Sequence, residues 1–491
     1  MSAKAIEGLV PSLVWQRFYE ISQVPRPSKS EEKIRTYLRN FAVENNLVFN
    51  EDETGNIVIH VKATPGFENA PIIVLQSHVD MVCEKNKGTE HDFMNDPIKI
   101  IRVGEWIKAD GTTLGADNGI GAAAALALAT DDGFTHGPLE LLFTVDEETG
   151  LTGANHLQKN FISGKTLLNL DTEEDGAFYV GCSGGMDTLG ILDVEYGKIN
   201  TNKNLFSIFV NGLKGGHSGI NIADGRANAI KLLALILDKL NQLDYQLLSI
   251  QGGSKRNAIA REAEALILIN ENDESQMREL VNEFTIESSL EYKYTDPELR
   301  VSIIKKDQDS LKNQKAFAEN FKKKVINSLL AMPHGVVSMN PTIPGLVETS
   351  TNLATVNMSS TDLKIGTSQR SSIENAKKNI GRAVQSVFNL VEAKVLVTDG
   401  YPGWQPNIDS NILKLAKSVF IELFNKEPEI KAVHAGLECG ILGDKFPGLD
   451  MISFGPTIEG AHSPDERVKI DDVNKFYKLL KAILSELALK K

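Results

Sequence analysis

The chain has 491 residues, too many for one ordinary domain, and its length predicts two to four domains. Hydrophobic residues make up 42% and charged residues 24% of the chain, which is typical of a globular protein with real cores. The net charge of -13 argues against nucleic acid or an anionic membrane as a partner, since both require basic patches.

The 3 cysteines lie far apart with no C-x-x-C pair, which favours a reducing compartment over a disulfide framework. The first residues show no signal-peptide pattern, and no apolar run reaches the roughly 18 residues of a membrane span. We therefore expect a cytoplasmic protein that binds neither membranes nor nucleic acid.

The first predicted elements are two helices, a strand over 57–61 and a buried strand that ends in His78 and Asp80. The second helix opens at 28–31, Ser-Lys-Ser-Glu, which resembles a capping box. Open α/β sheets place their chemistry where strands end, so His78 is a candidate metal ligand and Asp80 the carboxylate that orients it. On this segment alone, an ordinary hydrogen-bonded histidine remains the commoner alternative.

Glycines crowd Asp117 just before the alanine-rich run 122–128, which predicts a buried helix. Glycine permits tight turns and close approach of the backbone. Asp117 either caps this helix or serves as a metal ligand in an unusual loop, and the segment leaves both interpretations open.

Two further strands end in acidic residues. The strand 139–145 runs into Asp-Glu-Glu at 146–148, and the strand 167–170 ends at Asp171. Acids directly after a buried strand are costly unless water solvates them, the usual case, or a cation neutralises them. Because the ends of parallel strands converge on one edge of a sheet, the recurrence of such acids predicts a shared site.

The region 190–398 lacks acids at its strand ends, and we predict an inserted α/β domain there. Its expected elements are strands over 206–210, 266–269 and 346–356 and helices over 226–243, 274–286, 310–330 and 372–391. The flanking segments 1–189 and 399–491 then form one discontinuous domain. The predicted fold class is α/β, with a mixed, mostly parallel sheet flanked by helices.

The returning segment supplies a second histidine at a strand exit. A strand over 450–455 leads into a loop that contains His462, and an amphipathic helix over 470–490 closes the chain. A second histidine is the ligand that a site for two metals would otherwise lack.

Two Zn²⁺ ions could share Asp117, one also bound by His78 and Asp171 and the other by Glu148 and His462. Three carboxylates, four metal charges and one bridging hydroxide sum to zero, which is a reasonable charge to bury. The same ligands suit Co²⁺ or Mn²⁺.

Two metals in such a site activate a shared water and polarise a carbonyl. The reaction also needs a proton carrier. Either Glu147 or Glu148 can bind metal while the other takes the proton from water and delivers it to the leaving amine, and spacing alone leaves both assignments open.

Six motifs in order form a specific pattern. They are Ser-His-Val-Asp at 77–80, Gly-Ala-Asp-Asn-Gly at 115–119, Glu-Glu-Thr-Gly at 147–150, Leu-Asp at 170–171, Gly-Gly-His-Ser-Gly at 215–219 and Gly-Ala-His-Ser-Pro-Asp-Glu at 460–466. This set resembles the di-zinc peptidase superfamily of carnosinase, carboxypeptidase G2 and acetylornithine deacetylase. The long insert and the runs at 256–259, 401–406 and 434–440 are similar to the aminoacyl-histidine dipeptidases, a family of bacterial cytosolic non-specific dipeptidases.

The resemblance implies a role for each candidate in the discontinuous domain, which becomes the catalytic domain. The implied ligands are His78 and Asp171 on one zinc, Glu148 and His462 on the other, and Asp117 as the bridge. Glu147 becomes the general acid/base, and Asp80 becomes the carboxylate behind the first histidine.

The resemblance also implies that the insert is a lid and dimerisation domain. His217 would reach the active site from this domain and stabilise the oxyanion, in some relatives across a dimer. The substrate contacts that the resemblance suggests are Asn257, Arg370, Gly436 and Glu438.

The expected protein is therefore a cytosolic, homodimeric metallodipeptidase with two Zn²⁺ per subunit. It would hydrolyse unblocked dipeptides, including aminoacyl-histidine substrates such as carnosine. An amidohydrolase that removes acyl groups from N-acyl amino acids would use the same metals. A catalytically inactive scaffold on this fold is the third possibility, and the intact ligand set argues against it.

Overall fold

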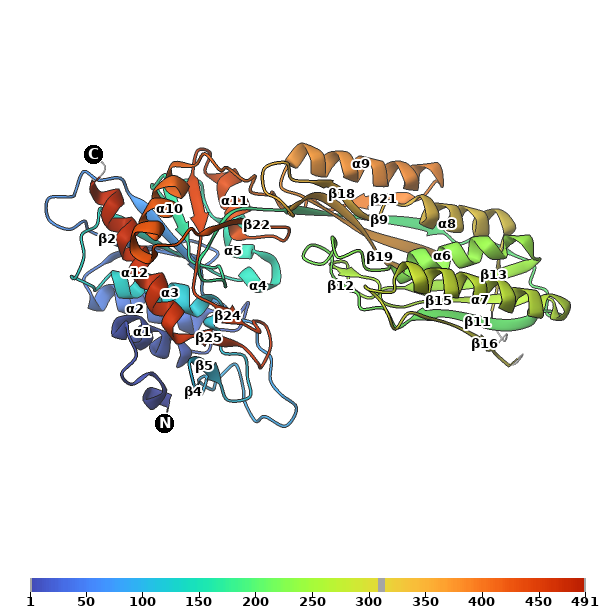
Figure 1. Cartoon of the computed structure of the whole chain (residues 1–491), viewed down its shortest axis with the longest axis horizontal. Coiled ribbons are helices and arrows are strands. Elements are labelled where there is room, and N and C mark those ends of the chain that lie inside the picture. The colour runs from blue at the N-terminus through green and yellow to red at the C-terminus, as the bar shows by residue number, and fades with distance from the viewer. Residues whose placement is uncertain (1, 308–313, 490–491) are drawn as a thin grey trace. The chain divides into compact units, whose positions relative to one another are not determined.

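The computed structural model describes residues 2–307 and 314–489, and the chain divides into two compact units. The first unit comprises Met1–Gly181, Trp404–Ala432 and Leu437–Lys491, and the second comprises Cys182–Gly403 and Val433–Gly436. Compared with the predicted insert at 190–398, the second unit begins earlier, ends later and takes in a short segment near 434. Figure 1 traces the elements of both units along the chain.

The first unit is built on an eight-stranded sheet with parallel strands at its centre. Its order is β1 (Val48–Glu51), β2 (Ile57–Val61), β6 (Leu139–Thr144), β3 (Ile73–His78), β7 (Thr166–Asn169), β23 (Asp450–Ser453), β8 (Ala177–Cys182) and β22 (Glu429–Val433). The pairs β6–β3, β3–β7 and β7–β23 are parallel, whereas β1–β2, β2–β6 and β23–β8 are antiparallel. The predicted α/β class is confirmed.

Helices flank this sheet, and the longer ones each bury an apolar face. They are α1 (Ser12–Ser22), α2 (Glu32–Glu44), α3 (Ala116–Leu128), α4 (Glu147–Gly150), α5 (Thr152–His156), α10 (Asn411–Phe424), α11 (Glu438–Lys445) and α12 (Ile470–Leu489), after a short 3₁₀ helix, η1 (Ser2–Ile6). The alanine-rich α3 is buried along almost its whole length and packs against α1 and β3. Small side chains at these positions let helix and sheet backbones approach closely.

A separate four-stranded sheet in the first unit carries the turn with His462. Its order is β24 (Ile458–Glu459), β25 (Arg467–Lys469), β5 (Trp106–Ala109) and β4 (Ile100–Val103). The β24–β25 connection thus holds the second predicted histidine next to strands that precede α3 in the chain.

The second unit is an antiparallel sheet packed against helices. The sheet contains β16 (Arg300–Lys305), β11 (Asn204–Asn211), β15 (Ala263–Ile269), β13 (Tyr245–Gly252), β19 (Val347–Met358), β20 (Asp362–Ser371), β9 (Gly184–Asp193) and β21 (Lys394–Val397), with β18 (Gly335–Met339) beside β19. The helices are α6 (Ala229–Lys239), α7 (Glu274–Glu291), α8 (Glu319–Ala331) and α9 (Glu374–Leu390), with 3₁₀ turns η2 (Leu240–Gln242) and η3 (Glu271–Asp273). Two-stranded pairs join β10 (Tyr196–Gly197) to β17 (Ala316–Phe317) and β12 (Gly216–His217) to β14 (Ala258–Ile259).

Two local predictions differ from the structure. The predicted helix over 310–330 is α8, which begins only at Glu319, and the predicted residues 310–313 lie outside the described part of the chain. The predicted capping box at 28–31 is wrong. The Ser28 hydroxyl donates to Asp80 Oδ2 at 2.8 Å, while Glu31 Oε1 accepts from the backbone N–H of Lys29 at 2.7 Å.

Among the described residues, no helix has the length and apolar character needed to cross a membrane.

Candidate metal centre

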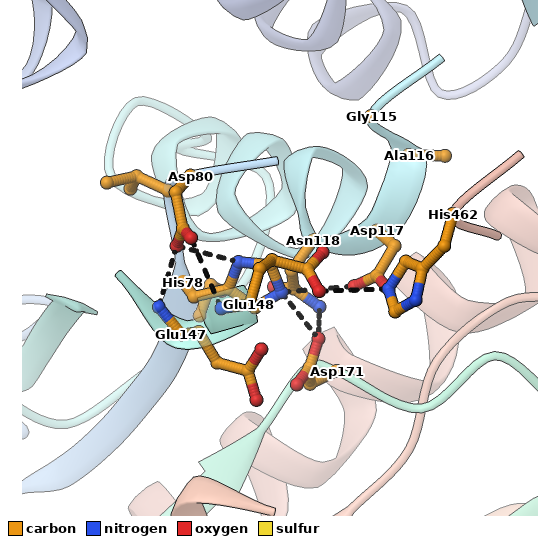
Figure 2. Close-up of polar contacts among 12 residues, drawn as sticks. His78, Asp80, Gly115, Ala116, Asp117, Asn118, Glu147, Glu148, Asp171 and His462 are labelled. Atoms are coloured by element: carbon orange, nitrogen blue, oxygen red, sulfur yellow. Dashed lines mark hydrogen bonds and ion pairs between the residues drawn. The ribbon is translucent and has the colours of Figure 1, made fainter. Parts of the chain in front are cut away.

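Five side chains that the sequence singled out converge at one edge of the first unit's sheet (Figure 2). His78 is the last residue of β3, Glu148 lies in α4 directly after β6, and Asp171 follows β7. Because these three strands are parallel, their carboxyl ends meet. Asp117 at the start of α3 and His462 from the β24–β25 turn complete the group.

Asp117 lies between the two imidazoles and turns one carboxylate oxygen toward each. Its Oδ1 is 3.0 Å from His78 Nε2, and its Oδ2 is 3.1 Å from His462 Nε2. On the two outer sides, Asp171 Oδ1 lies 3.4 Å from His78 Nε2, and Glu148 Oε2 lies 2.9 Å from His462 Nε2. Two three-ligand groups that share one aspartate therefore stand side by side.

Asp80 holds the first histidine and the following acidic turn together. This carboxylate is fully buried, and its Oδ1 lies 3.3 Å from His78 Nδ1. It also accepts the backbone N–H groups of Glu147 at 3.0 Å and Glu148 at 3.2 Å. A partner on Nδ1 leaves the Nε2 lone pair of the imidazole free for a metal.

Asn118 orients a candidate metal ligand, a role that the sequence did not reveal. Its side-chain amide donates to Leu170 O at 2.8 Å and to Asp171 Oδ1, so it fixes the orientation of that carboxylate. Only the position of this asparagine, next to Asp117 in the motif, could have drawn attention to it. The N-cap position of α3 belongs to Gly115, with no side-chain cap, so the Asp117 carboxylate is directed at the imidazoles instead.

The electrostatics of the group reflect an excess of negative charge. Burial raises the pKa of Asp171 to about 6 and the pKa of Glu147 well above its ordinary value. Hydrogen bonds to Asp117 and Glu148 raise the pKa of His462 to about 11. Without a cation, these shifts favour the protonated forms of the two carboxyl groups. Bound cations would lower the pKa values of the same groups and favour the ionised carboxylates.

The side chains present fit a pair of divalent cations. Glu148 Oε1 is buried and has no hydrogen-bond partner among the described residues, which is costly for a carboxylate oxygen in the absence of a cation. The donor set of two imidazoles and three carboxylates is one that Zn²⁺, Co²⁺ and Mn²⁺ accept. The ligand atoms within each three-residue group lie within 4.8 Å of one another.

In the second unit, the structure brings together two of the predicted residues, His217 and Arg370. The backbone N–H groups of Gly219 and Ile220 each donate to His217 Nδ1 at 3.2 Å, so the neutral imidazole carries its proton on Nε2. That Nε2 lies 3.5 Å from Arg370 Nη2. Two N–H donors at this separation are close enough to donate to one anionic oxygen.

The other predicted contacts occupy different surroundings. Asn257 and His217 line a cavity of about 770 Å³ in the second unit. Gly436 packs against the ring of Tyr401, where an added Cβ would lie 2.8 Å from the ring. Glu438, in the first unit, is fully buried, and its Oε2 accepts from Gln76 Nε2 at 2.6 Å. Its contact with substrate stays a prediction.

The sequence pattern of the peptidase family M20/M25/M40 matches residues 74–486, and the chain belongs to this family. The predicted membership of a metallopeptidase superfamily is thereby confirmed.

Particular relatives are similar over the whole length. The cytosol non-specific dipeptidase of Escherichia coli (strain K12) is 40% identical over 487 residues, which cover 99% of each chain. The crystal structure of aminoacylhistidine dipeptidase from Vibrio alginolyticus has a TM-score of 0.90 at 39% identity and covers 98% of each chain. An aminopeptidase from Bacillus cereus shares the fold, with a TM-score of 0.57 at 17% identity over 98% of this chain and 99% of that one.

Proposed function

We propose that this protein is a metal-dependent dipeptidase that hydrolyses unblocked dipeptides, including aminoacyl-histidine substrates such as carnosine. The observation that carries the proposal is Asp117, whose two oxygens face two imidazoles within a chain similar over its whole length to named dipeptidases. We further propose that it works in the cytosol, as the name of the relative from E. coli states for that protein, and as a homodimer.

Two Zn²⁺ ions per subunit are the proposed cofactors, and Co²⁺ or Mn²⁺ are expected to substitute. His78 and Asp171 would hold one ion, Glu148 and His462 the other, and Asp117 both. Bound metals would supply Lewis acidity toward the peptide carbonyl and a lowered pKa for the attacking water.

Glu147 is proposed to move the proton. Its backbone N–H donates to Asp80 Oδ1 at 3.0 Å, which holds the backbone at the head of α4 in place. On this proposal, its carboxylate accepts a proton from the attacking water and then delivers that proton to the leaving amine nitrogen. Asp80 takes no part in the transfer, but it orients His78 and the acidic turn at once.

His217 and Arg370 are proposed to bind the substrate's oxygens. The Nε2–H of His217 would donate to the oxygen that gains charge in the transition state. The Arg370 guanidinium, whose Nη1 donates to the Tyr401 hydroxyl at 2.9 Å, would pair with the substrate carboxylate. Both roles depend on donors that the second unit already orients.

The test is hydrolysis of a substrate panel by protein stripped of metal and then supplied with Zn²⁺, Mn²⁺ or Co²⁺. The panel contains carnosine, plain dipeptides, tripeptides and N-acetylated amino acids. We expect metal-dependent cleavage confined to dipeptides with a free amine. Cleavage of acylated amino acids alone would replace the dipeptidase with an amidohydrolase, and bound metal without any cleavage would favour a scaffold.

A further inference from the structure

Glu466 binds the turn that presents Asp117. This glutamate is buried, lies in the β24–β25 connection and is four positions after His462 in the chain. Its Oε2 accepts the backbone N–H groups of Leu114 at 2.7 Å and Gly115 at 2.9 Å. Its Oε1 accepts those of Ala116 at 2.7 Å and Asp117 at 3.2 Å.

The backbone of this turn suits a carboxylate for two reasons. The first N–H groups of a helix have no partner within the helix, and the N-terminus of α3 therefore presents free donors. Gly115 has φ 68°, a left-handed conformation that favours glycine and turns successive N–H groups to one side. The two oxygens of Glu466 accept four successive N–H groups, two from the turn before α3 and two from its first residues.

Arg26 holds the opposite side of the same turn. This buried guanidinium donates from Nη1 to Val79 O at 3.0 Å and to Asp80 O at 2.9 Å, and from Nη2 to Gly115 O. One guanidinium therefore joins the end of β3 to the turn before α3. A Cβ on residue 115 would collide with Arg26 Nη2, so the turn and the arginine fit closely.

We propose that Glu466 and Arg26 are positioning residues of the metal centre, which fix the direction of Asp117 relative to His78 and His462. The inference rests on the proposed function, because it presumes that the centre holds metal. Through these two side chains, hydrogen bonds connect three segments that each carry a ligand: the end of β3, the start of α3 and the β24–β25 turn. The N–H that Glu466 accepts at 3.2 Å belongs to Asp117 itself.

The test compares Glu466→Gln with a matched control in the same hairpin, Glu459→Gln. Glu459 is half-exposed and pairs with Arg467 across the strands. A glutamine at 466 turns an N–H₂ group toward two backbone donors, so the turn must shift. We expect its affinity for Zn²⁺, measured by competition with a chromophoric chelator, to fall about 10–100-fold. The absorption bands of the Co²⁺-loaded variant should shift as well, while Glu459→Gln should match the native protein in both measurements.

Four outcomes are distinguishable. A folded Glu466→Gln protein with native affinity and a native Co²⁺ spectrum would overturn the inference. If that variant does not fold, Arg26→Lys replaces it, because one ammonium cannot serve both segments, and native values in that variant would overturn the inference equally. If neither variant folds, the pair serves folding alone and the inference is overturned. If the native protein binds no metal, the proposed function fails instead.

Discussion

Asp80→Asn is the substitution that tests the centre most directly, because it changes one buried atom and no volume. Oδ1 of the carboxylate accepts the N–H of Glu147 and lies 3.3 Å from His78 Nδ1, and Oδ2 accepts from Ser28 Oγ and Glu148 N. Asparagine can keep the first pair of partners with its oxygen. Its amide nitrogen then faces a hydroxyl, which can accept, and the N–H of Glu148, which cannot.

The magnitude follows from that one orphaned N–H. A buried donor without a partner costs about 1–3 kcal/mol, so the free energy of unfolding of the metal-free protein should fall by about that amount. The loss of an oriented carboxylate behind His78 should lower kcat by about 10–100-fold, with KM nearly unchanged, since no substrate contact is removed.

The measurements are urea unfolding of the metal-free protein and steady-state hydrolysis of a dipeptide by the loaded protein. Asp110→Asn is the matched control, because Asp110 is exposed and its carboxylate pairs only with Lys99 in the described structure; both measurements should match the native protein. A native kcat together with native stability in Asp80→Asn would refute the role given to this carboxylate.

Three further substitutions and one treatment test the rest of the centre. Glu147→Ala should keep both metals by elemental analysis and lose turnover, and near-normal turnover would remove the acid/base assignment. His462→Ala should lower the metal content, since Glu148 and Asp117 are the remaining ligands on its side, and full occupancy would contradict that ligand set. His217→Ala should lower kcat by about 10²–10³, as the loss of an oxyanion donor does; an effect on KM alone would contradict its proposed role. Chelation should lower the melting temperature and return of Zn²⁺ should restore it, because a ligand that binds only the folded state stabilises it, and an unchanged melting temperature would argue against a metal centre.

The parts that sequence predicted well are those with a local signal. The strands that lead to His78 and Asp171 are short and buried: β3 ends at His78 itself, and β7 ends two residues before Asp171. Since the rule that parallel strand ends converge is general, the predicted neighbourhood of these side chains required no knowledge of the loops. Helix α12, predicted at 470–490, is observed at Ile470–Leu489. Its signal is also local, because its apolar residues recur with the regular spacing of a helix.

The parts that sequence could not supply depend on partners far along the chain. The pattern at Ser28 has the spacing of a capping box, but the Ser28 hydroxyl donates to the buried carboxylate of Asp80, which lies 52 residues later in the chain. Asp117 could be a cap or a ligand until the position of His462 was known. Arg26 lies in no motif, and Glu466 ends the motif at 460–466 without a role that the motif implies. The partners of both side chains are backbone atoms, which have no residue identity that a sequence pattern could show.

Because the first unit is discontinuous in the chain, its sheet can be completed only late in protein synthesis. Strand β23 lies between β7 and β8 in the sheet, although it is translated after the whole second unit. At about 5–20 residues per second, a ribosome needs on the order of 15–60 s to pass from Asp171 to His462. Throughout that interval the nascent chain has a gap in its central sheet and lacks its second histidine. A polypeptide released early therefore lacks part of the proposed ligand set, and the proposed hydrolysis can begin only when the last segment has left the ribosome.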